Sequence, residues 1–280
     1  MSIAIIINEL NMLLENKYER IFKKIRECAK ISIELSAKDE KYIPGIKYLE
    51  DHFLFDLPLY RNLRIVKYLA KCLPESSKVL DWGCGYGDVS HMLKTLRADI
   101  DITPYDVLTS PPWDILVNKE GIRKIIGTEE IALPFENNLF DAVIGIGVLE
   151  HVKDQNGSLC EIHRVLKPQG KLYIFLYPNK SSYTERFQKI IGNPHHDRPL
   201  RLNELKKLLE ASDFDLEDSK YELMMPFIMS RFPFASRHLY NYFGNLAMLL
   251  NNVLEKIPVL NKLSSNLTVI AQKKKESKTL

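Results

Sequence analysis

The spacing of apolar residues predicts helices in the first part of the chain. Before residue 75, apolar side chains recur at three- and four-residue intervals, which is the period of one helix face. Pro74, Ser76 and Ser77 then interrupt the pattern. We therefore expect a helical N-terminal cap over residues 1–75 and a second domain over residues 76–280. The recurring positions are Leu10, Leu13, Leu14, Tyr18 and Ile21, and then Leu59, Leu63, Val66 and Leu69.

From Lys78 onward, short apolar runs alternate with segments of helical period. Such alternation is typical of an α/β fold, in which a parallel sheet carries crossover helices on both faces. Residues 224–263 depart from the pattern, and their many Phe, Tyr, Met and Leu residues predict a helical insertion before the last strand. The expected strands lie at residues 79–80, 100–105, 142–146, 171–177 and 267–271, and the expected helices at 89–96, 159–166 and 203–211.

The segment with the clearest chemical meaning is Val-Leu-Asp-Trp-Gly-Cys-Gly-Tyr-Gly at residues 79–87. It places a strand, an acid and three glycines before a helix, and glycine lets a ligand approach bare backbone. A dinucleotide-binding loop would have a glycine at position 88, where pyrophosphate meets the helix N-terminus. This chain has Asp88 there and Asp81 before the loop, and carboxylates repel phosphates. The loop therefore favours a cationic ligand that bears an amino acid.

This loop resembles motif I of the class I S-adenosylmethionine-dependent methyltransferases. Further segments resemble that family in the same order, over about residues 78–178, with Gln169 in place of a common glycine. The resemblance implies a Rossmann-like fold with a mostly parallel seven-stranded sheet, helices on both faces, and methyl transfer as the reaction. The segments after the loop run from Leu133 to Phe135, Phe140 to Ile144, Gly147 to Val152 and Arg164 to Gly170.

The resemblance also implies S-adenosylmethionine as the methyl donor and S-adenosylhomocysteine as the product. In the family, an acid at the end of the second strand holds the ribose hydroxyls. Asp106, nineteen positions after Gly87, fits that role, and Asp101 is the alternative. Another acid reaches the adenine amino group, and both Glu129 and Glu130 match its position. The implied donor-binding residues are Asp81, Trp82, Gly83, Cys84, Gly85, Gly87, Asp106, Val107, Glu129, Glu130, Gly145 and Ile146.

Three residues of the loop region also have purely structural interpretations. Asp81 is a candidate helix cap, Trp82 a candidate core residue and Cys84 a small packing residue. The Ser-Pro-Pro-Trp sequence at residues 110–113 is similar to a tetrapeptide of methyltransferases that act on DNA bases. In those enzymes the tetrapeptide follows the fourth strand, whereas here it follows the second. We therefore interpret it as a loop breaker.

Three histidines are candidates for catalysis. The sulfonium of the donor already activates the methyl group, so the protein chiefly aligns the reactants. A hydroxyl acceptor benefits from a base, and the candidates are His151, after the fourth strand, and His195 or His196, in a polar loop after the fifth. An amine acceptor needs no base. A structural role is the alternative for each histidine.

The expected acceptor is a small molecule that is methylated on oxygen or nitrogen. The last third of the chain loosely resembles methyltransferases of glycan, lipid-linked or natural-product pathways. The first alternative is a non-catalytic protein of the same fold that binds a nucleoside-like ligand or a partner, and intact Asp81 and Asp106 argue against it. An RNA methyltransferase ranks third, because a formal net charge of +3 on 280 residues is too small to indicate a nucleic-acid partner.

The remaining composition predicts an intracellular protein without a metal. Four scattered cysteines indicate reduced thiols, and no His, Asp or Glu cluster has metal-ligand spacing. The apolar run at residues 3–7 lacks the flanks of a signal peptide, and no run reaches the roughly 18 apolar residues of a membrane span. We therefore expect a cytoplasmic protein.

The aromatic-rich residues 224–263 have three interpretations that the sequence leaves open. They form the core of the insertion, line a pocket for an apolar acceptor, or rest on a membrane surface together with Arg231, Arg237 and Lys256. The candidate pocket residues are Tyr183, Phe187, Tyr240 and Tyr242.

Overall fold

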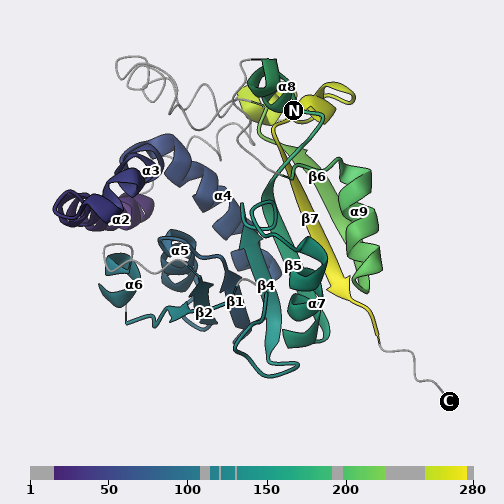
Figure 1. The fold of residues 1–280 in the computed structure, drawn as a ribbon, viewed down its shortest axis with the longest axis horizontal. Coiled ribbons are helices and arrows are strands. Elements are labelled where there is room, and N and C mark those ends of the chain that lie inside the picture. Colours follow the sequence, from purple (N-terminus) through teal and green to yellow (C-terminus); the bar gives the residue numbers. More distant parts are fainter. Residues whose placement is uncertain are drawn as a thin grey trace.

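A mixed seven-stranded sheet in the order β3-β2-β1-β4-β5-β7-β6 forms the centre of the computed structural model (Figure 1). The structure describes residues 16–107, 114–119, 121–129, 131–190, 198–224 and 250–275. The strands from β3 to β5 pair in parallel, and β7 runs antiparallel between β5 and β6, which confirms the predicted mostly parallel sheet. The strands are β1 Lys78–Trp82, β2 Asp101–Asp106, β3 Ile125–Ile126, β4 Phe140–Ile146, β5 Leu166–Pro178, β6 Phe214–Glu222 and β7 Asn266–Lys273.

Helices cover both faces of this sheet (Figure 1). Successive strand residues point to opposite faces, so Val79 packs with the N-terminal helices while Leu80 packs with α7 and α9. Phe22, Leu49 and Leu63, from three N-terminal helices, are completely buried in the same core as Val79. The predicted cap and the sheet therefore share one hydrophobic core. The helices are α2 Asn16–Ser36, α3 Ile43–Phe53, α4 Asp56–Cys72, α5 Asp88–Leu96, α6 Ile115–Lys119, α7 Gln155–Val165, α8 Tyr183–Ile190 and α9 Leu202–Ala211, with the 3-10 turns η1 Glu40–Tyr42 and η3 Leu260–Leu263.

The two sheet edges depart most from the pattern expected from sequence. β3 has two residues, and β6 has mostly exposed or half-buried polar residues, so neither forms an apolar run. An edge strand pairs on one side only, which allows this polarity. Of the predicted insertion, residues 225–249 lie outside the described residues, while residues 250–254 and η3 are helical. Within the part of the chain that is described, no helix is long and apolar enough to span a membrane.

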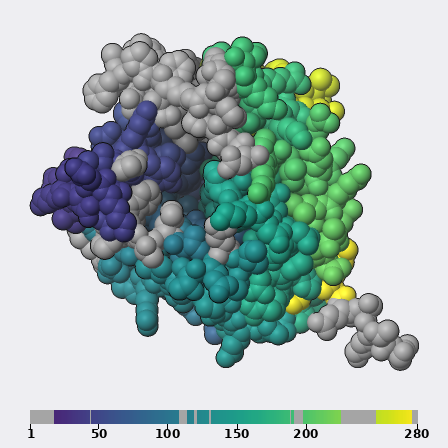
Figure 2. All heavy atoms as spheres, viewed as in Figure 1, coloured from purple at the N-terminus to yellow at the C-terminus, as the bar shows by residue number. Residues whose placement is uncertain are grey.

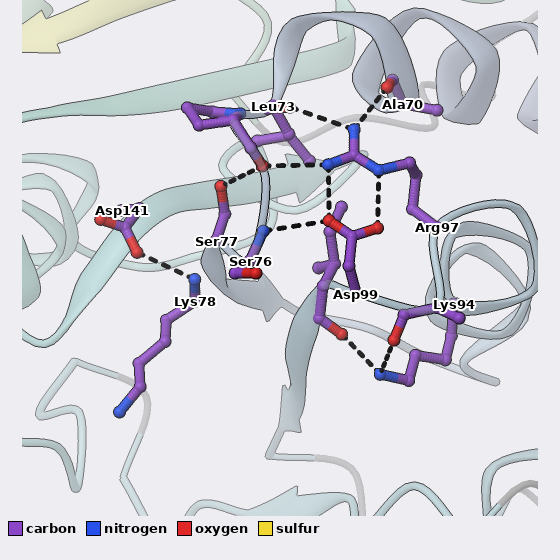
Figure 3. A network of polar contacts seen from close by, with 12 residues as sticks. Ala70, Leu73, Ser76, Ser77, Lys78, Lys94, Arg97, Asp99 and Asp141 are labelled. Atoms are coloured by element: carbon purple, nitrogen blue, oxygen red, sulfur yellow. Dashed lines mark hydrogen bonds and ion pairs between the residues drawn. The ribbon is translucent and has the colours of Figure 1, made fainter.

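A polar network holds the amino edge of the sheet (Figure 3). The Arg97 guanidinium donates to the carbonyls of Ala70 and Leu73, at 2.7 and 3.1 Å, and so satisfies carbonyls at the end of α4. The same guanidinium pairs with Asp99 at 2.8 Å, and that carboxylate accepts from the Ser76 amide at 3.0 Å. These contacts join α4 to the starts of β1 and β2, at the edge opposite the glycine loop.

Candidate active site

The glycine loop lies at the carboxyl end of β1, between β2 and β4. The strand order reverses here, because the chain adds β2 and β3 on one side of β1 and β4 and β5 on the other. Ligands of open α/β sheets bind at such a point. Figure 2 shows a recess on this face between the purple N-terminal helices and the teal central part of the chain.

All three glycines of the loop adopt left-handed backbone conformations, with φ of 69° at Gly83, 52° at Gly85 and 81° at Gly87. A Cβ on Gly83 would lie 2.4 Å from a Val148 methyl, and one on Gly87 would lie 2.2 Å from a Val117 methyl. A Cβ on Gly85 would meet nothing within 4 Å. Gly83 and Gly87 therefore allow close packing, whereas Gly85 presents bare backbone to open space.

Asp106 and the glycine loop meet through the peptide of Gly85. The buried Asp106 carboxylate accepts a hydrogen bond from the Gly85 amide at 2.7 Å. On the other side, the Lys124 ammonium donates to the Gly85 carbonyl at 3.1 Å and lies 3.1 Å from an Asp114 carboxylate oxygen. Lys124 belongs to no motif that would single it out in the sequence. The two contacts hold the amide and the carbonyl of Gly85 near the end of β2. Val107, the residue that follows Asp106, is 39% exposed.

Asp81 is a buried carboxylate at the base of the loop. It accepts from the Ser90 hydroxyl of α5 at 2.5 Å. The pKa of Asp81 is raised to about 7, chiefly by burial, with the carboxylates of Asp88 and Asp106 adding to the rise and the Ser90 hydrogen bond opposing it. The N-cap residue of α5 is Gly87, so the helix-cap interpretation of Asp81 is wrong. The site collects three carboxylates around the loop, which favours a cationic ligand.

A buried polar chain leads from α4 to the start of α5. The Arg61 guanidinium donates to the Asn62 side chain at 3.0 Å, and Asn62 donates to the Asp88 carboxylate at 2.7 Å. All three residues are at most 9% exposed. Burial lowers the pKa of Arg61 and raises that of Asp88. A single cation in a helix carries no distinctive sequence signal, so only the packing of α4 against α5 reveals that Arg61 lies near the loop.

The N-terminal helices also clamp the loop through Tyr86. The Tyr86 and Ser32 hydroxyls lie 2.8 Å apart, and the Tyr86 ring lies 4.8 Å from that of Phe53, measured between centroids. Tyr48 of α3 is 42% exposed, yet desolvation raises its pKa to about 12, with the charge of Asp88 as the next cause. α2 and α3 thus contact the loop on the side of the recess that the purple helices border in Figure 2.

Other predicted donor-binding residues are buried or packed. Trp82 is 4% exposed in the core, and its ring lies 3.1 Å from where a Cβ on Gly145 would be, so the core interpretation of the Trp82 side chain is confirmed. Burial raises the pKa of the Cys84 thiol well above its usual value, as expected for a packing residue. Ile146 is half-buried at the carboxyl end of β4. The donor-binding roles of these residues stay predictions.

The structure describes some of the predicted acids and histidines but not others. The Glu129 side chain is exposed, and its carbonyl accepts from the Tyr105 hydroxyl at 3.3 Å, beside the end of β2. The His151 side chain is 58% exposed, and its Nε2 lies 3.8 Å from the carboxylate of Glu150, whose side chain is 3% exposed. Glu150 is a buried acid after β4 that was not among the predicted site residues. Glu130, His195 and His196 lie outside the described residues.

Arg164 joins two of the family-like segments. Its guanidinium donates to the carbonyls of Leu133 and Phe135, at 2.9 and 2.7 Å. It also donates to Glu161 at 2.8 Å, and Glu161 accepts from the Leu133 amide at 2.9 Å. The segment around Pro134 is thereby held against α7, next to the strand β4 that follows it.

Comparison with known proteins identifies the family of this chain. Residues 51–219 match a family model described as a methyltransferase domain. The chain belongs to this family. The match begins inside the predicted cap, near the end of α3, and includes all of α4, which packs in the same core as the sheet.

Individual relatives cover only part of the chain. A probable S-adenosylmethionine-dependent methyltransferase of Mycolicibacterium smegmatis is 30% identical, and the match covers 64% of this chain and 65% of that protein. The demethylmenaquinone methyltransferase of Thermotoga maritima is 32% identical over 43% of this chain and 52% of that protein. The chain thus matches less than two thirds of the length of either relative. The Burkholderia thailandensis 1,6-didemethyltoxoflavin-N1-methyltransferase, solved with bound 1,6-didemethyltoxoflavin and S-adenosylhomocysteine, shares the fold. Its TM-score is 0.50 at 19% identity, and the match covers 76% of this chain and 78% of that one.

Proposed function

We propose that this protein transfers a methyl group from S-adenosylmethionine to a small-molecule acceptor. The observation that carries the proposal is the Asp106 carboxylate, bound to the Gly85 amide where the strand order reverses. Open space lies beside Gly85 at the same point. The family match and the names of the relatives support the proposal.

The charges around the loop fit this donor. Its amino-acid part carries an ammonium and a carboxylate, and its sulfur carries a positive charge. Asp81 and Asp106 supply negative charge beside the loop, and the buried Arg61 supplies a positive charge next to Asp88. We assign the donor ammonium to the Asp81 side of the loop, the donor carboxylate to Arg61, and the ribose hydroxyls to Asp106. When bound, the donor supplies a methyl group that its sulfonium already activates.

The chain itself then aligns the reactants and excludes water. α2 and α3 close one side of the recess, and the contacts of Tyr86 with Ser32 and Phe53 hold them on the loop. A hydroxyl acceptor additionally benefits from a base, for which His151, His195 and His196 remain the candidates. An amine acceptor makes all three dispensable.

The proposed acceptor is a small molecule and not a nucleic acid. The names of two similar proteins refer to small acceptors, demethylmenaquinone and 1,6-didemethyltoxoflavin. The mild net charge of +3 agrees with this class. Within it, glycan, lipid-linked and natural-product intermediates are the candidates, for methylation on oxygen or nitrogen.

Calorimetric titration with S-adenosylhomocysteine tests the donor assignment. The wild type is expected to bind in the micromolar range, and Asp106→Ala to bind at least about tenfold more weakly, a loss of about 1.4 kcal/mol. Asp101→Ala is the matched control, because Asp101 is an exposed acid at the opposite end of the same strand. It is expected to bind like the wild type, and NAD is expected not to bind.

Two other outcomes would redirect the assignment. If a folded wild type binds neither compound, or binds NAD, the donor proposal is wrong. If S-adenosylhomocysteine binds but an acceptor panel gives no methylated product with S-adenosylmethionine, the non-catalytic alternative takes its place.

A further inference from the structure

Two exposed apolar stripes lie on the described surface after β5. On α8, Tyr183, Phe187 and Ile190 are 37%, 59% and 82% exposed. Their spacing of four and three residues places them on one side of the helix. The second stripe runs through residues 250–259 and has the same helical spacing at its start. Its members Leu250, Val253, Ile257 and Val259 are 42%, 38%, 42% and 74% exposed.

Hydrogen bonds join the two stripes into one surface. The Tyr183 hydroxyl donates to the Met224 carbonyl at 2.7 Å, and the preceding residue, Leu223, donates its amide to the Glu255 carboxylate at 2.6 Å. Asn179, just before α8, donates to the Lys262 carbonyl at 3.0 Å. In Figure 1, α8 lies beside the yellow segment that precedes β7. We call residues 180–190 and 250–262 the α8 surface.

The charges exposed on the α8 surface are positive. Its two acids are withdrawn from solvent: Glu185 is 3% exposed, and Glu255 accepts from Asn251 and from the Leu223 amide and pairs with Arg64. Whatever docks here therefore meets apolar side chains among cations. The exposed cations are Lys180, Arg186, Lys189, Lys256 and Lys262, of which Lys180 lies 3.9 Å from the Glu204 carboxylate just outside this surface.

The α8 surface lies near the carboxyl edge of the sheet. α8 follows the carboxyl end of β5, and β5 runs parallel to β4. The carboxyl ends of parallel strands meet at one edge of a sheet, so the α8 surface adjoins the edge that holds the glycine loop. A body bound to the α8 surface would lie beside the edge where the recess opens.

We propose that the α8 surface docks on an anionic lipid bilayer. Interfacial helices place aromatic and aliphatic residues at the acyl boundary and Lys or Arg among the headgroups, which is the composition seen here. Protein–protein interfaces, by contrast, are depleted of lysine. Four of the five exposed cations are lysines, which favours the lipid over an acidic protein partner.

Vesicle co-sedimentation of the full chain tests this proposal without requiring methyl transfer. The wild type is expected to sediment with phosphatidylcholine vesicles that contain about one quarter phosphatidylglycerol, and much less with phosphatidylcholine alone. Phe187→Ser and Lys189→Glu are each expected to lower the bound fraction several-fold, and added salt to lower it for the wild type.

Matched controls keep the test specific. Ile43→Ser changes an apolar residue that is 50% exposed on α3, and Lys71→Glu reverses an exposed lysine at the end of α4. Both are expected to bind like the wild type. Equal binding of all variants, or no binding by the wild type, would overturn the proposal. So would a dimer in size-exclusion chromatography that Phe187→Ser dissociates without changing vesicle binding. S-adenosylhomocysteine titration is a separate measurement, so failure here leaves the donor assignment in place.

Discussion

The Asp81 carboxylate, buried in β1 at the base of the glycine loop, makes the stability of the protein depend on pH. Its folded-state pKa is raised to about 7 by burial, whereas an unfolded Asp titrates near its ordinary value of 3.8. An acid with a raised pKa contributes stability that is fully present below its unfolded pKa and is lost as the pH rises through the folded value. The charged form that would attract a cationic ligand is therefore the form that destabilises the free protein.

Asp81→Asn separates these two effects, because the amide oxygen can still accept from Ser90. At about pH 8 the variant is expected to unfold at a higher temperature than the wild type, and at about pH 4 the difference is expected to disappear. Its affinity for S-adenosylhomocysteine is expected to fall, since the ammonium of the ligand loses a counter-charge. Thermal unfolding at both pH values and calorimetric titration measure the two effects. A stability difference independent of pH would contradict the assignment of the shift to Asp81.

Substituting alanine for the glycines of the loop is expected to reduce stability by different amounts at Gly87 and Gly85. Gly87→Ala places a Cβ 2.2 Å from the buried Val117, so it is expected to cost about 2 kcal/mol or more from overpacking and backbone strain. Gly85→Ala adds a Cβ in open space, so only the strain of about 1–2 kcal/mol is expected, together with weaker S-adenosylhomocysteine binding. Denaturant unfolding and titration of both variants check this, and equal stability losses would contradict it.

At the scale of elements, the two edges of the sheet have different tasks. The amino edge carries the network around Arg97, which ties α4 to the starts of β1 and β2 (Figure 3). The carboxyl edge carries the glycine loop and its acids. Changes at the amino edge should therefore affect stability without affecting the ligand.

Arg97→Ala tests this division. The variant loses donors to the carbonyls at the end of α4 and the pair with Asp99, so its melting temperature is expected to fall by a few degrees. Its affinity for S-adenosylhomocysteine is expected to match the wild type. Lys71→Ala, an exposed lysine in the last turn of α4, serves as the control and is expected to change neither quantity. A large loss of affinity in Arg97→Ala would show that the two edges are coupled.

For the whole molecule, the N-terminal helices and the sheet behave as parts of one core. Phe22 and Leu63 lie in the same cluster as Val79 and Ile144 of the central strands. The predicted boundary at residue 75 separates helical from α/β sequence, but the hydrophobic core crosses it.

One core predicts one cooperative unfolding transition. Calorimetry of the full chain is expected to give a single peak whose calorimetric and van't Hoff enthalpies agree. A saturating concentration of S-adenosylhomocysteine is expected to move that peak to higher temperature as a unit. Two peaks, with only the later one shifted by the ligand, would instead show that the cap folds as a separate domain.

Local features of the sequence determined much of this fold and part of the site. Val79 and Leu80, before an acid and a glycine loop, indicated the central strand and the ligand-binding turn, because strand period and turn chemistry depend on neighbouring residues. Asp106 was a candidate because the resemblance to the methyltransferase family implies an acid at the end of the second strand. The polar edge strand β6 was not predictable, because its burial depends on one partner strand.

Only the tertiary structure decided which distant side chains share the recess. Arg61 lies 26 residues before Gly87 and is linked to Asp88 of α5 through Asn62. Lys124 lies in a segment without a motif, yet it donates to the Gly85 carbonyl. The α8 surface likewise joins residues that are about 70 positions apart. Such contacts depend on how helices and strands pack, and packing leaves no periodic signal in a single sequence. The sequence by itself therefore determined the fold class and the glycine loop that binds a ligand. The packing of helices and strands decided which charged side chains lie around that loop.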